Sequence, residues 1–133
     1  MKVLSFGKVF TLTAVCSLLA MFGQSNRADR LYTNQADIKV VNAPTSDGTI
    51  VFDFEPDGGI PQRITVQVQK HWPEGSVARE IERVFNEEVG ANYKVTWNNK
   101  RKVTITKRSR KRKFLLGNVE YSAKGVTVKI DYD

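Results

Sequence analysis

Residues 64–90 decide the fold, and they have the sequence ITVQVQKHWPEGSVAREIERVFNEEVG. At the start of this stretch Ile64, Val66 and Val68 alternate with polar side chains, as in a half-buried strand. Apolar residues then return at helical spacing, and they are Val77, Ile81, Val84, Phe85 and Val89. Ser76 is a candidate N-cap and Gly90 a candidate C-terminal stop. The stretch therefore predicts a strand followed by one amphipathic helix over residues 77–89.

Alternating apolar and polar side chains also occur on both sides of this stretch. The segments are 38–40, 50–54, 93–97, 103–105 and 126–132, with the apolar run 114–116 as a less regular candidate. Alternation is typical of antiparallel or mixed sheets with one face in water, and not of a buried parallel sheet.

The predicted elements follow the order β-β-β-α-β-β-β, with residues 114–116 as an additional strand. This order predicts an α+β domain in which one helix packs on one face of a small antiparallel or mixed sheet of four to six strands. The first two strands are candidates for a separate hairpin layer. Asn98 and Asn99 are expected to form the turn of a later hairpin, because asparagine tolerates positive φ.

The N-terminal residues have the composition of an export signal. Lys2 and Lys8 precede an uncharged, mostly apolar run over residues 9–22, which is followed by small and polar residues. Fourteen residues in a helix span about 21 Å, less than the ~30 Å of a bilayer's hydrocarbon core. A cleaved signal peptide is therefore favoured over a permanent anchor.

Small residues place the cleavage point near Ser25, with a site after Ala20 and lipidation at Cys16 as weaker alternatives. Cys16 is the only cysteine, so a processed chain would have no disulfide and no cysteine metal ligand. The predicted organisation is a signal peptide over 1–25, a polar leader over 26–36 and a single α+β domain over 37–133. The protein is predicted to be secreted or periplasmic.

Positive charge is concentrated in one short part of the chain. Residues 100–113 contain no acidic residue and nine cations, namely Lys100, Arg101, Lys102, Lys107, Arg108, Arg110, Lys111, Arg112 and Lys113. The whole chain has 21 Lys and Arg against 14 Asp and Glu. Without residues 1–25 the net charge is +5 (19 − 14), and without the nine cations as well it is −4 (10 − 14). This asymmetry predicts an anion-binding site on a hairpin and the loop that leaves it.

The expected partners of this site are anionic envelope polymers or lipid head groups, which gain by counter-ion release. Nucleic acid is a further option, but the basic stretch holds no aromatic residue on which bases could stack. Trp97 shares its face with Tyr93 and is expected in the core, whereas Phe114 fits either setting. The alternative without a partner is a solvated loop whose charge protects an edge strand.

Few residues favour an enzyme or a metal site. His71 is the only histidine, and without cysteines it cannot build a typical zinc site. Asp53, Glu55 and Asp57 before Gly58 resemble the opening of a calcium loop, but Ile64 stands where the bidentate glutamate belongs. The sequence thus predicts no catalytic residue, no metal and no small-molecule cofactor.

The favoured function is an exported, non-enzymatic module that binds an anionic surface or polymer. The alternative is a structural subunit of an envelope or virion complex, which joins protein neighbours through an exposed strand. A small hydrolase, or an inhibitor of one, is the least favoured option.

Overall fold

The computed structural model describes residues 32–98 and 100–132. The predicted signal peptide and most of the predicted leader lie outside these residues. The elements are β2 (Gln35–Asn42), β3 (Gly48–Pro56), β4 (Gln62–Val68), α3 (Glu74–Val89), β5 (Tyr93–Asn98), β6 (Lys102–Lys107), β7 (Phe114–Tyr121) and β8 (Thr127–Tyr132). The α+β class and the strand at 114–116 are therefore confirmed. β2 begins at Gln35, so the sheet includes the last residues of the predicted leader.

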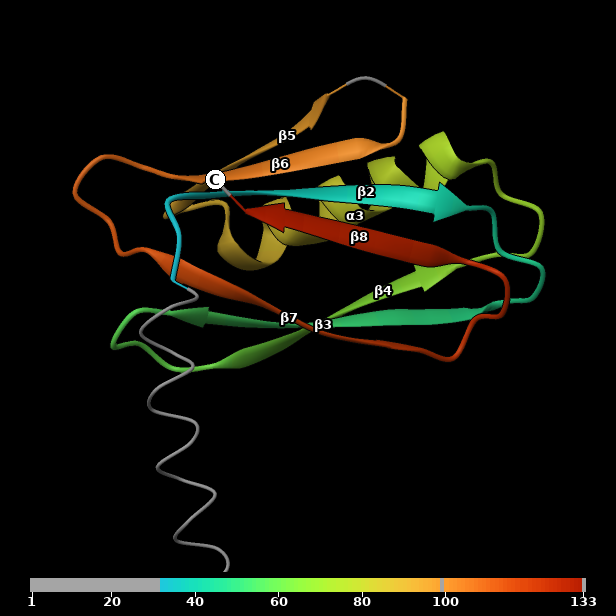
Figure 1. Cartoon of the computed structure of the whole chain (residues 1–133), viewed down its shortest axis with the longest axis horizontal. Helices are drawn as coiled ribbons and strands as arrows, with labels where there is room; N and C mark the ends of the chain where they lie inside the picture. Colours follow the sequence, from blue (N-terminus) through green and yellow to red (C-terminus); the bar gives the residue numbers. More distant parts are fainter. Residues whose placement is uncertain (1–31, 99, 133) are drawn as a thin grey trace, which may run out of the picture. The chain divides into compact units, whose positions relative to one another are not determined.

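The strands form two antiparallel sheets, where the sequence predicted one (Figure 1). One sheet has the order β5-β6-β2-β8, and the other has the order β4-β3-β7. The predicted hairpin of the first two strands is wrong, because β2 pairs with β6 and β8 while β3 pairs with β4 and β7. Alternation indicates that a segment is a strand, but it does not identify the strand's partner.

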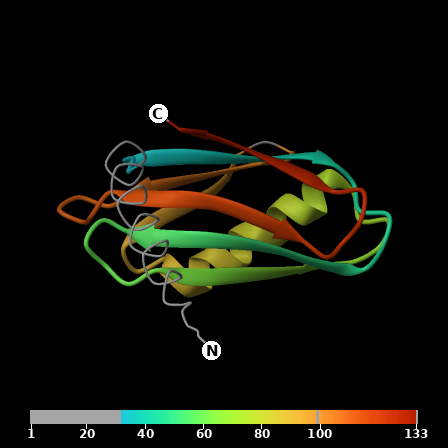
Figure 2. The same ribbon diagram turned by 60° about the horizontal axis from the view of Figure 1, so that its bottom comes forward.

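The sheets meet along β7 and β8. In the described part of the chain these two strands share no backbone pairing, and tyrosine hydroxyls connect them instead. The Tyr121 hydroxyl accepts a hydrogen bond from the Val128 amide at 2.9 Å, and the Tyr132 hydroxyl donates to the Leu116 carbonyl. The opposite edge strands, β4 and β5, both pack against α3. The two sheets thus surround the core, and α3 covers its remaining side (Figures 1 and 2).

The helix is longer than predicted. It begins at Glu74, three residues before the predicted start, and its N-cap is Pro73 with no side-chain cap. Ser76 is consequently not the N-cap. The predicted apolar face is correct, since all five of its residues are buried. Phe85 from this face meets Phe52 edge to face, with ring centroids 5.3 Å apart.

Candidate anion-binding site

The structure divides the nine predicted cations between the two ends of β6. Lys100, Arg101 and Lys102, here called the hairpin cluster, lie at its start. The other six lie at its end, in residues 107–113, here called the basic loop (Figure 1, orange). Lys102 and Lys107 are five residues apart on an extended strand, and this separates the two groups by about 17 Å. The nine cations that the sequence placed in one stretch therefore form two separate groups.

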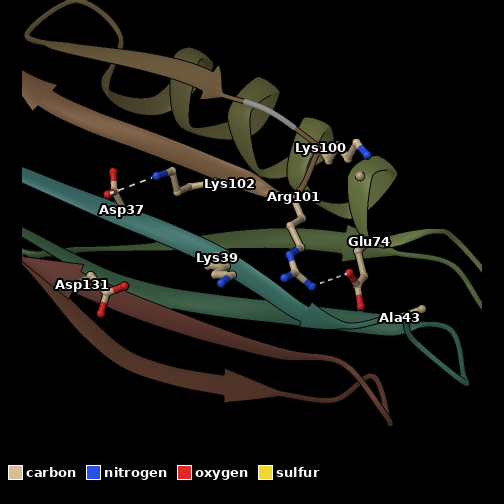
Figure 3. Close-up of a pocket in the computed structure, with 9 residues that line it drawn as sticks. Asp37, Lys39, Ala43, Glu74, Lys100, Arg101, Lys102 and Asp131 are labelled. Carbon is tan, nitrogen blue, oxygen red and sulfur yellow. Dashed lines mark hydrogen bonds and ion pairs between the residues drawn. The ribbon is translucent and has the colours of Figure 1, made fainter.

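The hairpin cluster lies beside acidic side chains (Figure 3). Arg101 Nη1 is 3.2 Å from Glu74 Oε1, and Lys102 Nζ is 3.8 Å from Asp37 Oδ2. These residues line a hollow of about 860 Å³, together with Lys39, Ala43, Gly75, Lys100 and Asp131. The hollow has four cations and three carboxylates, so most of its positive charge is compensated.

Strand register explains this mixture of charges. Lys39 on β2 lies opposite Lys102 on β6 and Lys129 on β8, which makes a row of three lysines. Like charges placed opposite one another repel. Asp37 and Asp131 form the next row and offset that repulsion. Asp37 also accepts a hydrogen bond from the Thr104 hydroxyl at 2.7 Å. Together the two rows carry three positive and two negative charges, so most of the charge on this sheet face is compensated.

The basic loop is different, because its backbone is held by hydrogen bonds to neighbouring elements. The Lys107 amide donates to the Asn34 carbonyl at 2.9 Å, and the Arg108 amide donates to the Asn92 carbonyl at 3.1 Å. Within the loop, the Lys111 amide donates to the Arg108 carbonyl at 3.0 Å. Arg110 adopts the left-handed conformation inside this turn, with φ of 66°. The loop therefore has a defined backbone path.

Two arginines of the basic loop serve as anchors. Arg108 Nε and Nη2 donate to the Gly90 carbonyl at 3.2 and 3.1 Å. α3 is described throughout and has no basic residue in its last turn, so Arg108 supplies the cation that a helix C-terminus favours. Arg112 Nη1 donates to the Asp57 carbonyl at 3.1 Å. These two side chains hold the loop against α3 and the β3–β4 turn.

Three cations of the basic loop are left facing solvent. Arg110, Lys111 and Lys113 are exposed, and none of their side chains makes a hydrogen bond or ion pair within residues 32–98 and 100–132. All six salt bridges of the described residues involve other cations. An anion can therefore approach these three side chains without displacing a carboxylate.

A buried aromatic cluster supports the basic loop from the core side. Phe54, Tyr93 and Phe114 are all buried, and their ring centroids lie 5.0 to 5.3 Å apart. The Tyr93 hydroxyl donates to the Arg112 carbonyl at 3.0 Å. Burial raises the pKa of this hydroxyl above its ordinary value, and the nearby Arg112 charge opposes that rise. Phe114 is thus a core residue and not a stacking platform.

Replacing Tyr93 by phenylalanine should lower the free energy of unfolding by about 1 kcal/mol, because the Arg112 carbonyl loses its donor. The unfolded state ionises its tyrosines at about pH 10, and the folded state keeps Tyr93 protonated to higher pH. Stability should therefore fall as pH rises above about 10. In Tyr93→Phe this fall should be smaller, and Tyr132, whose pKa burial also raises, accounts for the remainder. Urea unfolding measured at several pH values checks both effects, and an unchanged alkaline slope would contradict the assignment.

Trp97 does not lie in the core as predicted. It is 37% exposed, its Nε1 donates to the Lys100 carbonyl at 3.2 Å, and the Arg79 guanidinium lies 4.9 Å from its ring centroid. It shares a face with Tyr93 and Val95, but it comes at the end of β5 beside the start of α3. There the Arg79 guanidinium lies over the indole ring that the core leaves partly exposed.

The acidic residues and the histidine singled out in the sequence have structural partners. Asp53 lies 3.6 Å from Arg63 Nε, and Glu55 accepts from the Tyr32 hydroxyl at 2.7 Å. His71 is exposed in a turn, and its amide donates to the Pro44 carbonyl at 3.0 Å. Trp72, the next residue, packs partly buried against the core.

One exposed apolar residue beside the basic loop was not identified from the sequence. Ile60 is 84% exposed, the largest exposure among the large apolar residues that the structure describes. It lies in the β3–β4 turn, which Arg112 touches through the Asp57 carbonyl. The sequence feature that could have revealed it is a large apolar residue between Gly59 and Pro61, because turn residues are usually small or polar.

Residues 32–98 and 100–132 contain no group of three or more potential metal ligands. No helix within these residues has the length and apolar character needed to cross a bilayer. Comparisons with protein-family models, with curated proteins and with solved structures found no match for this chain.

Proposed function

We propose that this protein is an exported, non-enzymatic module that binds an anionic surface or polymer through its basic loop. The observation that carries the proposal is the state of Arg110, Lys111 and Lys113. They are exposed and without an acidic partner among the described residues, on a backbone that hydrogen bonds hold in place. A preorganised loop loses little conformational freedom when it binds.

Charge density favours the basic loop over the hairpin cluster. The loop has six cations in seven residues, and the adjoining turn over 57–61 adds one carboxylate, Asp57, for a net charge of +5. At the hairpin cluster, by contrast, Arg101 and Lys102 already form ion pairs with Glu74 and Asp37. An anion binding there must compete with these carboxylates. We therefore assign the main contacts to the loop.

Export is supported by the composition of residues 1–25, which have a basic start, an apolar centre and small residues near Ser25. The favoured location is the periplasm or the cell exterior. The polyanions of these compartments, anionic envelope polymers and lipid head groups, are the ligand classes we propose.

Salt dependence tests the proposed function. Three ionic contacts predict that affinity for heparin, a soluble polyanion, falls about 40-fold between about 50 and 200 mM salt. Neutral dextran is the control polymer and should not bind. Affinity for heparin that stays constant over this range, or equal binding to dextran, would contradict the proposal.

The same titration separates the alternative function, assembly through an exposed strand. Strand addition relies on backbone hydrogen bonds, which salt hardly screens. Self-association that persists at high salt while heparin binding is absent would favour the assembly subunit.

A further inference from the structure

Three features meet at one end of the folded domain. The basic loop lies there, and so does the β3–β4 turn over residues 57–61, at the same end of the strands in both views (Figures 1 and 2). The Asp57 amide donates to the Lys113 carbonyl at 2.8 Å, which fixes the turn beside the loop. The third feature is the start of the described chain, since Thr33 pairs with Phe114 directly after the loop. We call this end the basic end.

Ile60 adds an apolar group to the basic end. Its side chain is 84% exposed and has Gly59 and Pro61 as neighbours in the chain. A single exposed isoleucine is common on protein surfaces. Here, however, it lies on the turn fixed beside three cations without acidic partners. An apolar tip beside cations matches a membrane surface, where phosphates lie above acyl chains.

The path of the chain supports the same orientation. Nine residues separate Phe22, the end of the apolar run, from Tyr32. Even when fully extended they span at most about 35 Å. In the proposed export, residues 9–22 enter the bilayer before the predicted cleavage near Ser25, and this short connection places the start of the newly exported domain near the membrane. The end of the domain at Tyr32 is the basic end.

From these three observations we propose that the basic end binds anionic phospholipid bilayers. Arg110, Lys111 and Lys113 contact lipid phosphates, and Ile60 inserts among the head groups. The inference rests on the proposed function, because it names the ligand of the same loop. It also adds a requirement that a soluble polymer does not make, namely an apolar contact from Ile60.

Vesicle binding with two substitutions of opposite effect tests this inference. Full chain with Ile60→Ser should bind phosphatidylglycerol vesicles about tenfold more weakly than the wild type, because it loses an apolar contact. Ile60→Trp should bind at least as tightly as the wild type, and its additional fluorescence should shift to the blue, since tryptophan favours the membrane interface. Both variants should keep the wild-type affinity for heparin.

Phosphatidylcholine vesicles control for residues 9–22. An apolar segment inserts regardless of head-group charge, so only binding that requires phosphatidylglycerol counts for the basic end. Ile60 is exposed, and both variants should therefore match the wild-type melting temperature.

The outcomes separate the two proposals. If Ile60→Ser leaves vesicle binding unchanged while heparin still binds, the membrane inference is overturned and the proposed function stands. If neutralising Arg110, Lys111 and Lys113 together changes neither heparin nor vesicle binding, both proposals are overturned. Weaker binding of Ile60→Ser to vesicles alone supports the membrane inference.

Discussion

Replacing Arg110 by asparagine and Lys111 and Lys113 by glutamine should weaken heparin binding about 100-fold at low salt. Each cation near an anionic surface contributes roughly 1 kcal/mol, and three together correspond to about that factor. Asparagine is chosen at position 110 because it tolerates the left-handed backbone that Arg110 adopts. The slope of log affinity against log salt should also fall by about 2 to 3.

A matched variant removes the same charge elsewhere. Lys70, Lys124 and Lys129 are exposed and lie outside the basic loop. Changing all three to glutamine should alter heparin affinity by no more than about threefold, because distant surface charges are screened. Isothermal titration of both triple variants makes the comparison. Equal losses in the two would mean that net charge, and not the loop, determines binding.

Truncating Phe54 to alanine should lower the free energy of unfolding by about 3–5 kcal/mol, the largest stability effect that we predict. Phe54 is 1% exposed and stacks on Phe114 with ring centroids 5.2 Å apart. It also meets Phe85 and Tyr93 edge to face. Phe54 therefore links α3 to the aromatic cluster that supports the basic loop. The cavity left by the alanine would remove contacts both from α3 and from the aromatic residues that support the basic loop.

Ile60→Ala is the control for Phe54→Ala. It also truncates a large apolar side chain, but one that is mostly in solvent, and its unfolding free energy should stay within about 0.5 kcal/mol of the wild type. Chemical denaturation of the two variants provides the comparison. A loss below about 1.5 kcal/mol for Phe54→Ala would show that the aromatic cluster tolerates the cavity.

Local pattern was sufficient to predict the strands and the helix, but not the way in which the strands pair. Residues 64–68 and 77–89 carry their periods within a few residues of sequence, and both elements form, although the helix begins three residues earlier than predicted. The division into two sheets depends instead on which apolar faces fill the shared core. Phe52 and Phe85, for example, are 33 positions apart and meet ring to ring.

The candidate site was predictable in composition but not in geometry. The density of cations was visible, whereas their acidic partners are distant in sequence, as with Lys102 and Asp37. Strand β6 then separates in space two groups that look continuous in the sequence. The anchoring roles of Arg108 and Arg112 depend on the carbonyls of Gly90 and Asp57. Every residue has a backbone carbonyl, so the sequence does not indicate which carbonyls accept these hydrogen bonds.

The position of β2 has a consequence for how this protein reaches its folded state. β2 is the first strand of the described residues, yet it lies between β6 and β8, with Ala36 opposite Ile105 on one side and Tyr132 on the other. Pairings over such long separations make folding slow. A chain that emerges from its N-terminus therefore holds β2 without partners until β6 follows, and without its second partner until β8 follows. For the exported protein that we propose, this topology delays the completion of the larger sheet until residues 127–132 have emerged.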